Sequence, residues 1–173
     1  MRKYSNLSVS DAPGKSYKTP FTLHQASPLL LKKLNNLYAL LLQGKERYEQ
    51  ISTVTYDRDL RRAILSLAQK SNQYACELSS QLQILGGLSP NEKSNDFGSQ
   101  IETETLKDEN QMLNFCMANE TRMVKAYHEV LNDSHIYEGL RSMIHYQLNG
   151  ILCAFVQVKQ LNSLKLHYNT VLS

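Results

Sequence analysis

The sequence predicts an all-α protein, and more specifically a four-helix bundle. Its 173 residues include only 7 glycines and 4 prolines, which is about half of their usual share in globular proteins. All-β folds need frequent turn residues, so they are disfavoured. Proline is absent from Leu29 to Ser89. Apolar residues recur at alternating steps of three and four, and this spacing places them on one face of a helix.

The chain is long enough to bury a core of its own, so we expect one domain. Residues 1–26 are polar, contain Pro13, Gly14 and Pro20, and show little periodicity. We expect them to form a flexible N-terminal tail. The bundle then occupies residues 27–173.

The first helix is expected over residues 28–54. Ser27 is a favoured N-cap residue, and Pro28 suits the first helical position because an N–H there has no partner in the helix. The positions of this helix that follow the three-and-four spacing form a stripe on one face, which we call its seam. They are Leu30, Leu34, Leu37, Leu41, Gly44, Tyr48 and Ile51.

The second helix is expected over residues 58–85. Asp57 can cap its start. Gly86 and Gly87 end it, because glycine tolerates the left-handed conformation that follows many helices. Its seam consists of Leu60, Ile64, Leu67, Ser71, Tyr74, Leu78, Leu82 and Leu85.

The third and fourth helices are expected over residues 100–131 and 134–168. Ser99 and Glu102 fit a capping box at the start of the third helix, and a short break at 132–134 precedes the fourth. The third seam is Leu106, Glu109, Leu113, Cys116, Glu120, Met123, Tyr127 and Val130. The fourth includes Leu140, Ile144, Leu148, Ile151, Phe155, Val158 and Leu161.

The link at residues 86–99 is the one long internal connection between these helices. The second helix has about 28 residues and is therefore about 42 Å long, whereas fourteen extended residues reach at most about 46–50 Å. The link can therefore run the length of the bundle, as a long crossover between helices two and three does in ferritin-like folds. The alternative is a loose loop between adjacent helix ends.

Several short motifs resemble those of an uncharacterised bacterial family, domain of unknown function 2383, whose fold is a ferritin-like helical bundle. The matching residues are Leu34-Asn-Asn-Leu37, Gly44, Tyr48, Ala75-Cys-Glu-Leu78, Leu85-Gly-Gly87, Glu120, Tyr127 and Leu131. The resemblance covers roughly residues 29–165. It implies a ferritin-like four-helix bundle in a bacterial cytoplasm, and it implies no activity.

A ferritin-like bundle raises the question of a di-iron site. Such a site takes one Glu from each of two helices and a Glu-x-x-His pair from each of the other two. The pair works because residues three apart lie on one helix face. This sequence has no such pair, because the residues three before its five histidines are Phe21, Lys125, Asn132, Ser142 and Leu164.

Glu120 is the one carboxylate at a ligand-like position of the seams, and a single carboxylate cannot hold a di-metal centre. We therefore expect no metal or other cofactor. Glu120, Glu77 and His145 are weak candidates for an atypical metal site.

The bundle interior is expected to contain a buried polar cluster of Glu120, Tyr48, Ser71 and Tyr74. A hydroxyl of Tyr48, Ser71 or Tyr74 would bond the Glu120 carboxylate, because an unpaired carboxylate is costly in a core. Gly44 lies in the middle of its seam, where we expect close helix packing or a small cavity.

Charge, hydropathy and cysteine content limit the partners and the cellular compartment that we expect. The net charge of +3 gives no sign of a nucleic-acid partner, and no apolar run approaches the roughly 20 residues of a membrane span. The three cysteines are widely spaced, as is typical of reduced thiols, so we expect a cytoplasmic protein.

The leading hypothesis is a non-enzymatic bundle that acts through protein–protein contacts, as a homodimer or with another partner, with helices three and four supplying the surface. One alternative is an iron or manganese oxidoreductase or storage protein with atypical ligands. Another is a bundle that binds a small ligand in a pocket beside Gly44. Of these, an enzyme is the less favoured hypothesis.

Overall fold

The computed structural model describes residues 26–87 and 109–171, and every regular element in these two ranges is a helix. The predicted all-α class and the four helices are therefore confirmed. The elements are α1 (Pro28–Val54), α2 (Arg58–Ile84), α3 (Glu109–Leu131) and α4 (Glu138–Val171).

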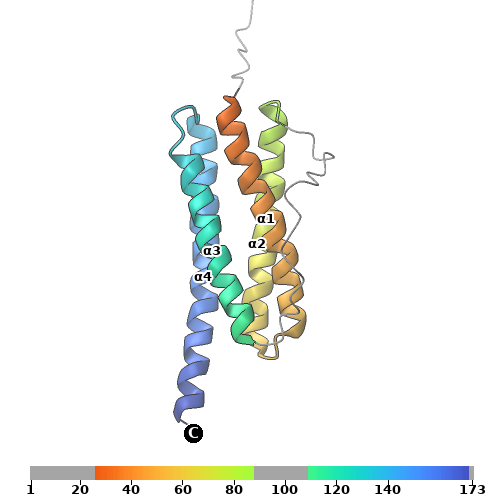
Figure 1. Ribbon diagram of the computed structural model, residues 1–173, viewed down its shortest axis with the longest axis vertical. Helices are drawn as coiled ribbons and strands as arrows, with labels where there is room; N and C mark the ends of the chain where they lie inside the picture. Colours follow the sequence, from red (N-terminus) through yellow and green to blue (C-terminus); the bar gives the residue numbers. More distant parts are fainter. Residues whose placement is uncertain (1–25, 88–108, 172–173) are drawn as a thin grey trace, which may run out of the picture.

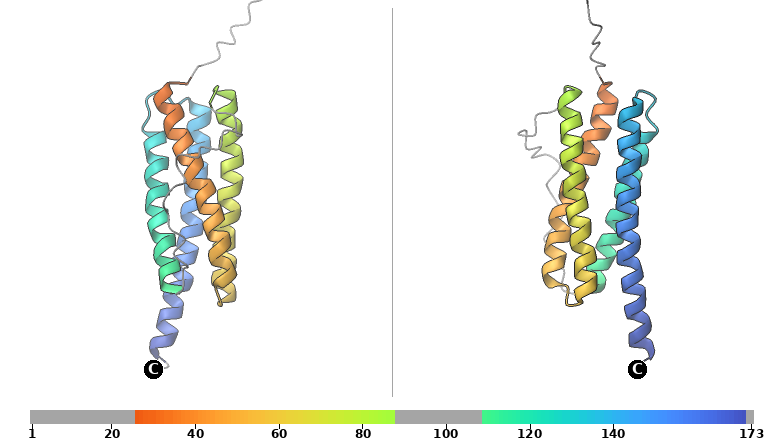
Figure 2. Two further views of the ribbon diagram at one scale, coloured as in Figure 1. Left: turned by 45° about the vertical axis from the view of Figure 1, so that its right-hand side comes forward. Right: turned by 180° about the vertical axis from the view of Figure 1, so that it is seen from behind.

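The four helices form a bundle in which each helix contacts two neighbours. α1 packs on α2 and α3, and α4 packs on the same two helices. The order around the bundle is therefore α1, α2, α4, α3, with α1 diagonally opposite α4. Figures 1 and 2 show that α1 and α4 run in one direction and that α2 and α3 run in the other, so neighbouring helices are antiparallel.

The end of α2 and the start of α3 lie at opposite ends of the bundle. α2 finishes beside the start of α1, whereas α3 starts at the far end, near the α1–α2 turn (Figure 1). The helical residues expected at 100–108 and the capping box at Ser99 and Glu102 lie outside the described residues.

The starts of α1 and α2 show the local chemistry expected from the sequence. The Ser27 hydroxyl accepts a hydrogen bond from the Leu30 N–H at 3.1 Å. The Asp57 carboxylate accepts one from the Leu60 N–H at 2.8 Å. Each cap satisfies a backbone donor that has no partner inside the helix.

The end of α2 depends on a glycine in the left-handed region. Gly86 has φ +73°, a conformation that is open to glycine at little cost. The next N–H, that of Gly87, donates to the Leu82 carbonyl at 2.7 Å, which satisfies one of the last carbonyls of the helix.

The core is formed by the predicted seams. Among the seam positions whose side chains are described, all are buried except Glu120 and Leu161. The expected positions Leu106 and Glu109 lie outside the described side chains. Each buried Leu, Ile or Phe contributes about 1.5–3 kcal/mol relative to an exposed one, so the seams supply most of the apolar stabilisation.

The start expected for helix four at residue 134 is wrong, because α4 begins at Glu138. The Asp133 carboxylate accepts the N–H of His135 at 3.0 Å, and the Asp133 carbonyl accepts the N–H of Ile136 at 3.4 Å. Aspartate favours such turns by bonding nearby backbone. Helical bonding starts only when the Tyr137 carbonyl accepts from Arg141.

The same aspartate ties this turn to α1. Lys33 Nζ lies 2.7 Å from Asp133 Oδ2, and only 2% of the Asp133 side chain is exposed. The hydrogen bond from Lys33 lowers the pKa of the Asp133 carboxyl below its usual value. This ion pair connects α1 to the turn before α4, between two residues that are 100 positions apart in the sequence.

Replacing Asp133 with Asn is expected to lower the free energy of unfolding at neutral pH by about 1–3 kcal/mol. Because the folded-state pKa of Asp133 is lowered, its contribution is complete above the unfolded-state pKa and is lost as pH falls through the folded-state pKa. Urea unfolding from about pH 5 down to about pH 2 should therefore show a shallower loss of stability in Asp133→Asn than in the natural protein.

The matched control for this titration is Asp59→Asn, because the Asp59 side chain is 71% exposed and lies 3.6 Å from Arg62. Its acid limb should follow that of the natural protein, since an exposed pair contributes little. Parallel acid limbs in Asp133→Asn and the natural protein would contradict the assignment.

α4 is longer than the other helices. It has 34 residues, whereas α1 and α2 have 27 each and α3 has 23. Figures 1 and 2 show its last turns continuing past the end of the bundle where α3 begins. We call this part of α4 the overhang.

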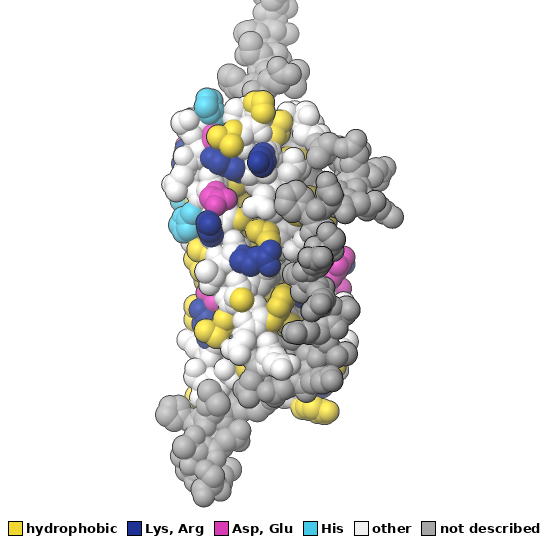
Figure 3. Space-filling model, in the orientation of Figure 1, with side chains coloured by type: hydrophobic (Ala, Val, Ile, Leu, Met, Phe, Trp, Pro, Cys, Tyr) yellow, Lys and Arg dark blue, Asp and Glu magenta, His cyan; other side chains and the backbone are white. Residues whose placement is uncertain are grey.

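The surface carries charges of both signs. On the face seen in Figure 3, Lys and Arg side chains are separated by polar, acidic and hydrophobic ones. None of the helices in the described ranges has the length and apolar character needed to cross a membrane.

Candidate functional site

The four residues expected to form one buried polar cluster lie in different environments. Tyr48, Ser71 and Tyr74 are buried in the core. The Glu120 side chain is 14% exposed and lies at the edge of the α3–α4 contact. The expected bond from a hydroxyl of the cluster to Glu120 is therefore wrong, because this carboxylate has another partner.

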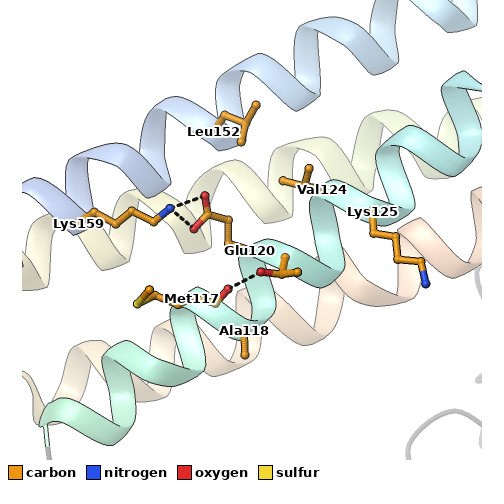
Figure 4. A pocket seen from close by; sticks show the side chains of 8 residues that line it. Met117, Ala118, Glu120, Val124, Lys125, Leu152 and Lys159 are labelled. Atoms are coloured by element: carbon orange, nitrogen blue, oxygen red, sulfur yellow. Dashed lines mark hydrogen bonds and ion pairs between the residues drawn. The ribbon is translucent and has the colours of Figure 1, made fainter.

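Glu120 is held by Lys159 of α4. Lys159 Nζ lies 2.8 Å from Oε1 and 2.6 Å from Oε2 of Glu120, so both carboxylate oxygens contact one ammonium (Figure 4). The seam position of Glu120 indicated an interior residue. The long Lys159 stem instead brings a cation to the boundary between α3 and α4.

Tyr48 bonds Asn119, a residue that the sequence did not single out. The Asn119 amide donates to the Tyr48 hydroxyl oxygen at 2.5 Å, between α1 and α3. The Tyr48 ring also meets Phe155 edge-on, with centroids 6.2 Å apart. Burial raises the pKa of Tyr48 far above its usual value, so the phenol stays neutral.

Gly44 lies where α1 and α3 approach closely. A Cβ at this position would be 2.8 Å from Met123 Cε and 3.2 Å from both Asn119 Nδ2 and Tyr48 Cε2. Of the two outcomes expected at Gly44, the structure shows close packing, and the surrounding side chains fill the space that a pocket would need.

Gln147 of α4 is fully buried and forms the centre of a second set of buried polar contacts. Its Nε2 donates to Glu77 Oε2 at 2.8 Å and to the Tyr74 carbonyl at 3.4 Å. Its Oε1 accepts from the Tyr127 hydroxyl at 3.4 Å. Gln147 therefore links α4 to α2 and α3. Its position four residues before Ile151 was the signal that could have placed it in the core.

Tyr74 packs against a second close-packed glycine. A Cβ on Gly150 would overlap the Tyr74 hydroxyl oxygen and lie 3.0 Å from Cζ. The Tyr74 ring also meets Tyr146 edge-on, with centroids 6.1 Å apart. The backbone of α4 is therefore in direct contact with an aromatic side chain of α2 at this level.

Ser71 of α2 is fully buried, and its hydroxyl has no hydrogen-bond partner among the described residues. A buried hydroxyl without a partner costs about 1–3 kcal/mol. The small side chain fits the core, and nothing in the structure explains why this buried residue carries a hydroxyl.

The three weak metal candidates lie apart. Glu120 pairs with Lys159, Glu77 accepts from Gln147 on α2's side of the core, and His145 is exposed on α4. Within residues 26–87 and 109–171, no three His, Cys, Asp or Glu side chains are placed to hold a metal ion together.

A groove of about 590 Å³ lies between α3 and α4 on the outside of the bundle. Figure 4 shows the Glu120–Lys159 ion pair at one side of it, with Val124 and Leu152 facing each other from the two helices and Lys125 pointing away. The groove is lined by Met117, Ala118, Glu120, Thr121, Val124, Lys125, Leu152 and Lys159.

A smaller hollow of about 20 Å³ shares Met117, Glu120 and Lys159 with the groove and reaches Phe155 in the core. Cys116 also lines it, and burial raises the pKa of this thiol to about 12. The thiol therefore stays protonated at neutral pH and acts as an apolar side chain.

No protein-family model matches the chain, and the search of curated proteins found no match. The interior presents hydrogen bonds between helices, from Asn119 to Tyr48 and from Gln147 to Glu77, and the α3–α4 groove presents apolar side chains beside an ion pair. The first arrangement is suited to holding helices together, and the second is suited to contact with another molecule.

Proposed function

We propose that the protein is a non-enzymatic helical bundle that binds another protein through the outer face of α3 and α4. The observation that carries the proposal is the groove between these helices. Its apolar lining is open to solvent, and Met117 at its edge is 53% exposed. Exposed apolar patches with polar rims are typical of protein interaction sites.

The fold part of the proposal is a ferritin-like bundle, similar to domain of unknown function 2383 and set in a bacterial cytoplasm. Support comes from the chain direction, because α2 ends and α3 starts at opposite ends of the bundle (Figure 1). A single long crossover between helices two and three gives this arrangement in ferritin-like folds.

The proposal of a non-enzymatic role is supported by what fills the interior. In di-metal bundles, inward-pointing carboxylates and histidines supply the ligands. In this chain, the buried interior instead holds a bond from Asn119 to Tyr48 and one from Tyr127 to Gln147. Both oxygens of Glu120 are held by Lys159. These groups stabilise helix contacts and provide no preformed ligand set.

Metal loading tests this proposal. Untagged protein would be incubated with Fe(II) or Mn(II) without oxygen and freed of unbound ion, and its metal content would be measured by mass spectrometry. We expect far less than one ion per chain, and the same result for Glu120→Gln and Glu77→Gln. Stoichiometric metal that is lost in either variant would overturn the non-enzymatic proposal in favour of an atypical metal site.

A further inference from the structure

We propose that a second copy of this chain packs, around a two-fold axis, on the outer side of α2 and α4. α2 and α4 contact each other, and Figure 2 shows them side by side in the view from behind. We define the α2–α4 face as the exposed residues at positions 65–84 and 142–156, namely Leu65, Gln69, Asn72, Gln73, Cys76, Ser80, Gln83, Ile84, Ser142, His145, Tyr146, Asn149, Cys153 and Val156. This face shares no residue with the α3–α4 groove, so the inference goes beyond the function proposed above.

The residues of the face form one stripe along each helix. Exposed positions recur at steps of three and four from Leu65 to Gln83 in α2 and from Ser142 to Val156 in α4. Positions with this spacing lie on one side of a helix. The two stripes lie at the same height in the bundle, because Gln147 of α4 bonds Glu77 of α2 at 2.8 Å. Together they make one continuous surface.

The α2–α4 face has no charged side chain. None of the residues that define it is Lys, Arg, Asp or Glu, although these types make up about a quarter of an average protein and are mostly exposed. The outer sides of the other two helices do carry exposed charges, namely Lys32, Glu46 and Glu49 of α1 and Arg122, Lys125 and Glu129 of α3. Depletion of charge distinguishes the centre of protein interfaces from the rest of a protein surface.

Two charged residues of α2 lie within the same range, and both are half-buried. The Glu77 carboxylate accepts hydrogen bonds from the amides of Gln73 at 2.9 Å and Gln147 at 2.8 Å, so it is satisfied within the chain. Lys70 carries the opposite charge. The pair therefore adds no net charge to this side of the bundle.

The chemistry of the face determines which partner fits it. Nucleic acids and anionic membranes are bound through exposed Lys and Arg, which the face lacks. A charged protein surface would lose hydration there and gain no ion pair. The partner surface must therefore be uncharged. Among the outer sides of the four described helices, the α2–α4 face is the one that meets this requirement, and a second copy of the chain supplies it.

The face can also form hydrogen bonds with a copy of itself. Amides and hydroxyls each carry both a donor and an acceptor, and eight residues of the face have one: Gln69, Asn72, Gln73, Ser80, Gln83, Ser142, Tyr146 and Asn149. A two-fold axis places each residue i of one copy against j of the other, and j against i. Donors and acceptors are therefore present on both sides of such a contact.

Tyr146 provides an aromatic anchor for this contact. Its ring meets the buried Tyr74 edge-on, with centroids 6.1 Å apart, yet 60% of the residue is exposed. The inner edge of the ring is thus held by the core while the outer part is available to a partner. Tyrosine is among the residues that contribute most to interface stability.

The size of the face predicts a dimer that depends on concentration. The stripes are about 20–30 Å long at about 1.5 Å per residue, and two helices packed about 10 Å apart present a surface about 20 Å wide. The face therefore covers about 500 Å² per copy, or about 1,000 Å² in total, which is near the lower limit for a specific interface.

The first test uses the natural protein and its own cysteines. Cys76 and Cys153 lie on the face and are exposed, whereas Cys116 is buried in the core. Molar mass would be measured by light scattering over a wide concentration range, alongside the rate at which a thiol reagent, dithionitrobenzoate, modifies the protein. We expect the mass to rise from 19.8 kDa to twice that value. We also expect the reaction of the two exposed thiols to slow in proportion to the loss of monomer.

The second test places a charge on the face without changing its shape. Gln69→Glu and Asn149→Asp each replace an amide with a carboxylate, and the two-fold axis brings two such charges into one interface. Each variant should weaken dimerisation about tenfold or more, with unchanged helix content by circular dichroism. The matched control is Asn114→Asp, the same exchange at an exposed position of α3, which should dimerise like the natural protein.

Three results would overturn the inference. One is a 19.8 kDa species at all concentrations up to about 1 mM. Another is a dimer in which Cys76 and Cys153 react as fast as in the monomer, since the second copy would then cover a different face. The third is a dimer that Asn114→Asp weakens as much as Gln69→Glu and Asn149→Asp do.

Discussion

Replacing Gly150 with Ala is expected to lower the free energy of unfolding by about 1–3 kcal/mol, although alanine is intrinsically the better helix former by about 1 kcal/mol. The added Cβ would overlap the Tyr74 hydroxyl oxygen and lie 3.0 Å from Cζ. Tyr74 is buried and meets Tyr146 edge-on, so its ring has little room to retreat. Urea unfolding measures the loss.

A second substitution identifies the cause of this loss. Adding Tyr74→Phe to Gly150→Ala removes the overlapping oxygen and should restore part of the stability. Gly139→Ala is the matched control, because its Cβ would meet only Tyr137 carbon atoms, at 3.2 Å and 3.6 Å, at the exposed start of α4. A Gly150→Ala protein that is more stable than the natural one would contradict the packing argument.

Replacing Gln147 with Ala is expected to lower the free energy of unfolding by about 2–4 kcal/mol. The substitution leaves a cavity among three helices and removes the partner of the Tyr127 hydroxyl. It also removes the amide that donates to Glu77. The loss can be measured by thermal and urea unfolding of the two proteins under the same conditions.

Gln147→Met separates the two contributions, because methionine fills a similar volume and makes no such hydrogen bonds. We expect an intermediate loss. The matched surface control is Gln157→Ala, an exposed position of the same helix, where a change within about 0.5 kcal/mol is expected. If Gln147→Met were as stable as the natural protein, the hydrogen bonds of Gln147 would not contribute to stability.

Much of the fold follows from local sequence signals. Heptad spacing identified the buried faces, and Ser27, Asp57 and Gly86 marked helix boundaries through caps that involve only neighbouring residues. These signals are readable because each depends on a few positions within one or two helical turns. The start of α4 was misplaced because Asp133 holds a turn by accepting the His135 N–H, and its other carboxylate oxygen pairs with Lys33 of a different helix.

The interior polar contacts could not be assigned in the same way. Tyr48 and Asn119 are 71 positions apart and Gln147 and Glu77 are 70 apart. Which of these residues meet depends on the relative rotation and height of the helices. Periodicity gives the inward face of one helix and leaves that rotation open. Glu120 is an example. Its seam position predicted an interior side chain, whereas the structure places it at the edge of the core, where it pairs with Lys159.

The close-packed glycines could also be identified only in part from the sequence. Gly44, Gly139 and Gly150 all lie within helices, and sequence spacing singled out only Gly44 because it falls in the middle of a seam. Gly150 proves to be equally constrained, since a tyrosine from another helix occupies the space above it. The groove between α3 and α4 could not be predicted either, because it depends on how far apart two helices pack.

The buried tyrosines also define an alkaline limit for the bundle. Burial raises the folded-state pKa of Tyr48 and Tyr127, whereas an unfolded tyrosine titrates near its usual value of about 10. Their contribution is therefore complete below about pH 10 and is lost as pH rises toward the folded-state values, because only the unfolded chain can release these protons. The core thus favours the folded state only while its phenols stay protonated, just as the Asp133 turn favours it only while its carboxylate stays ionised.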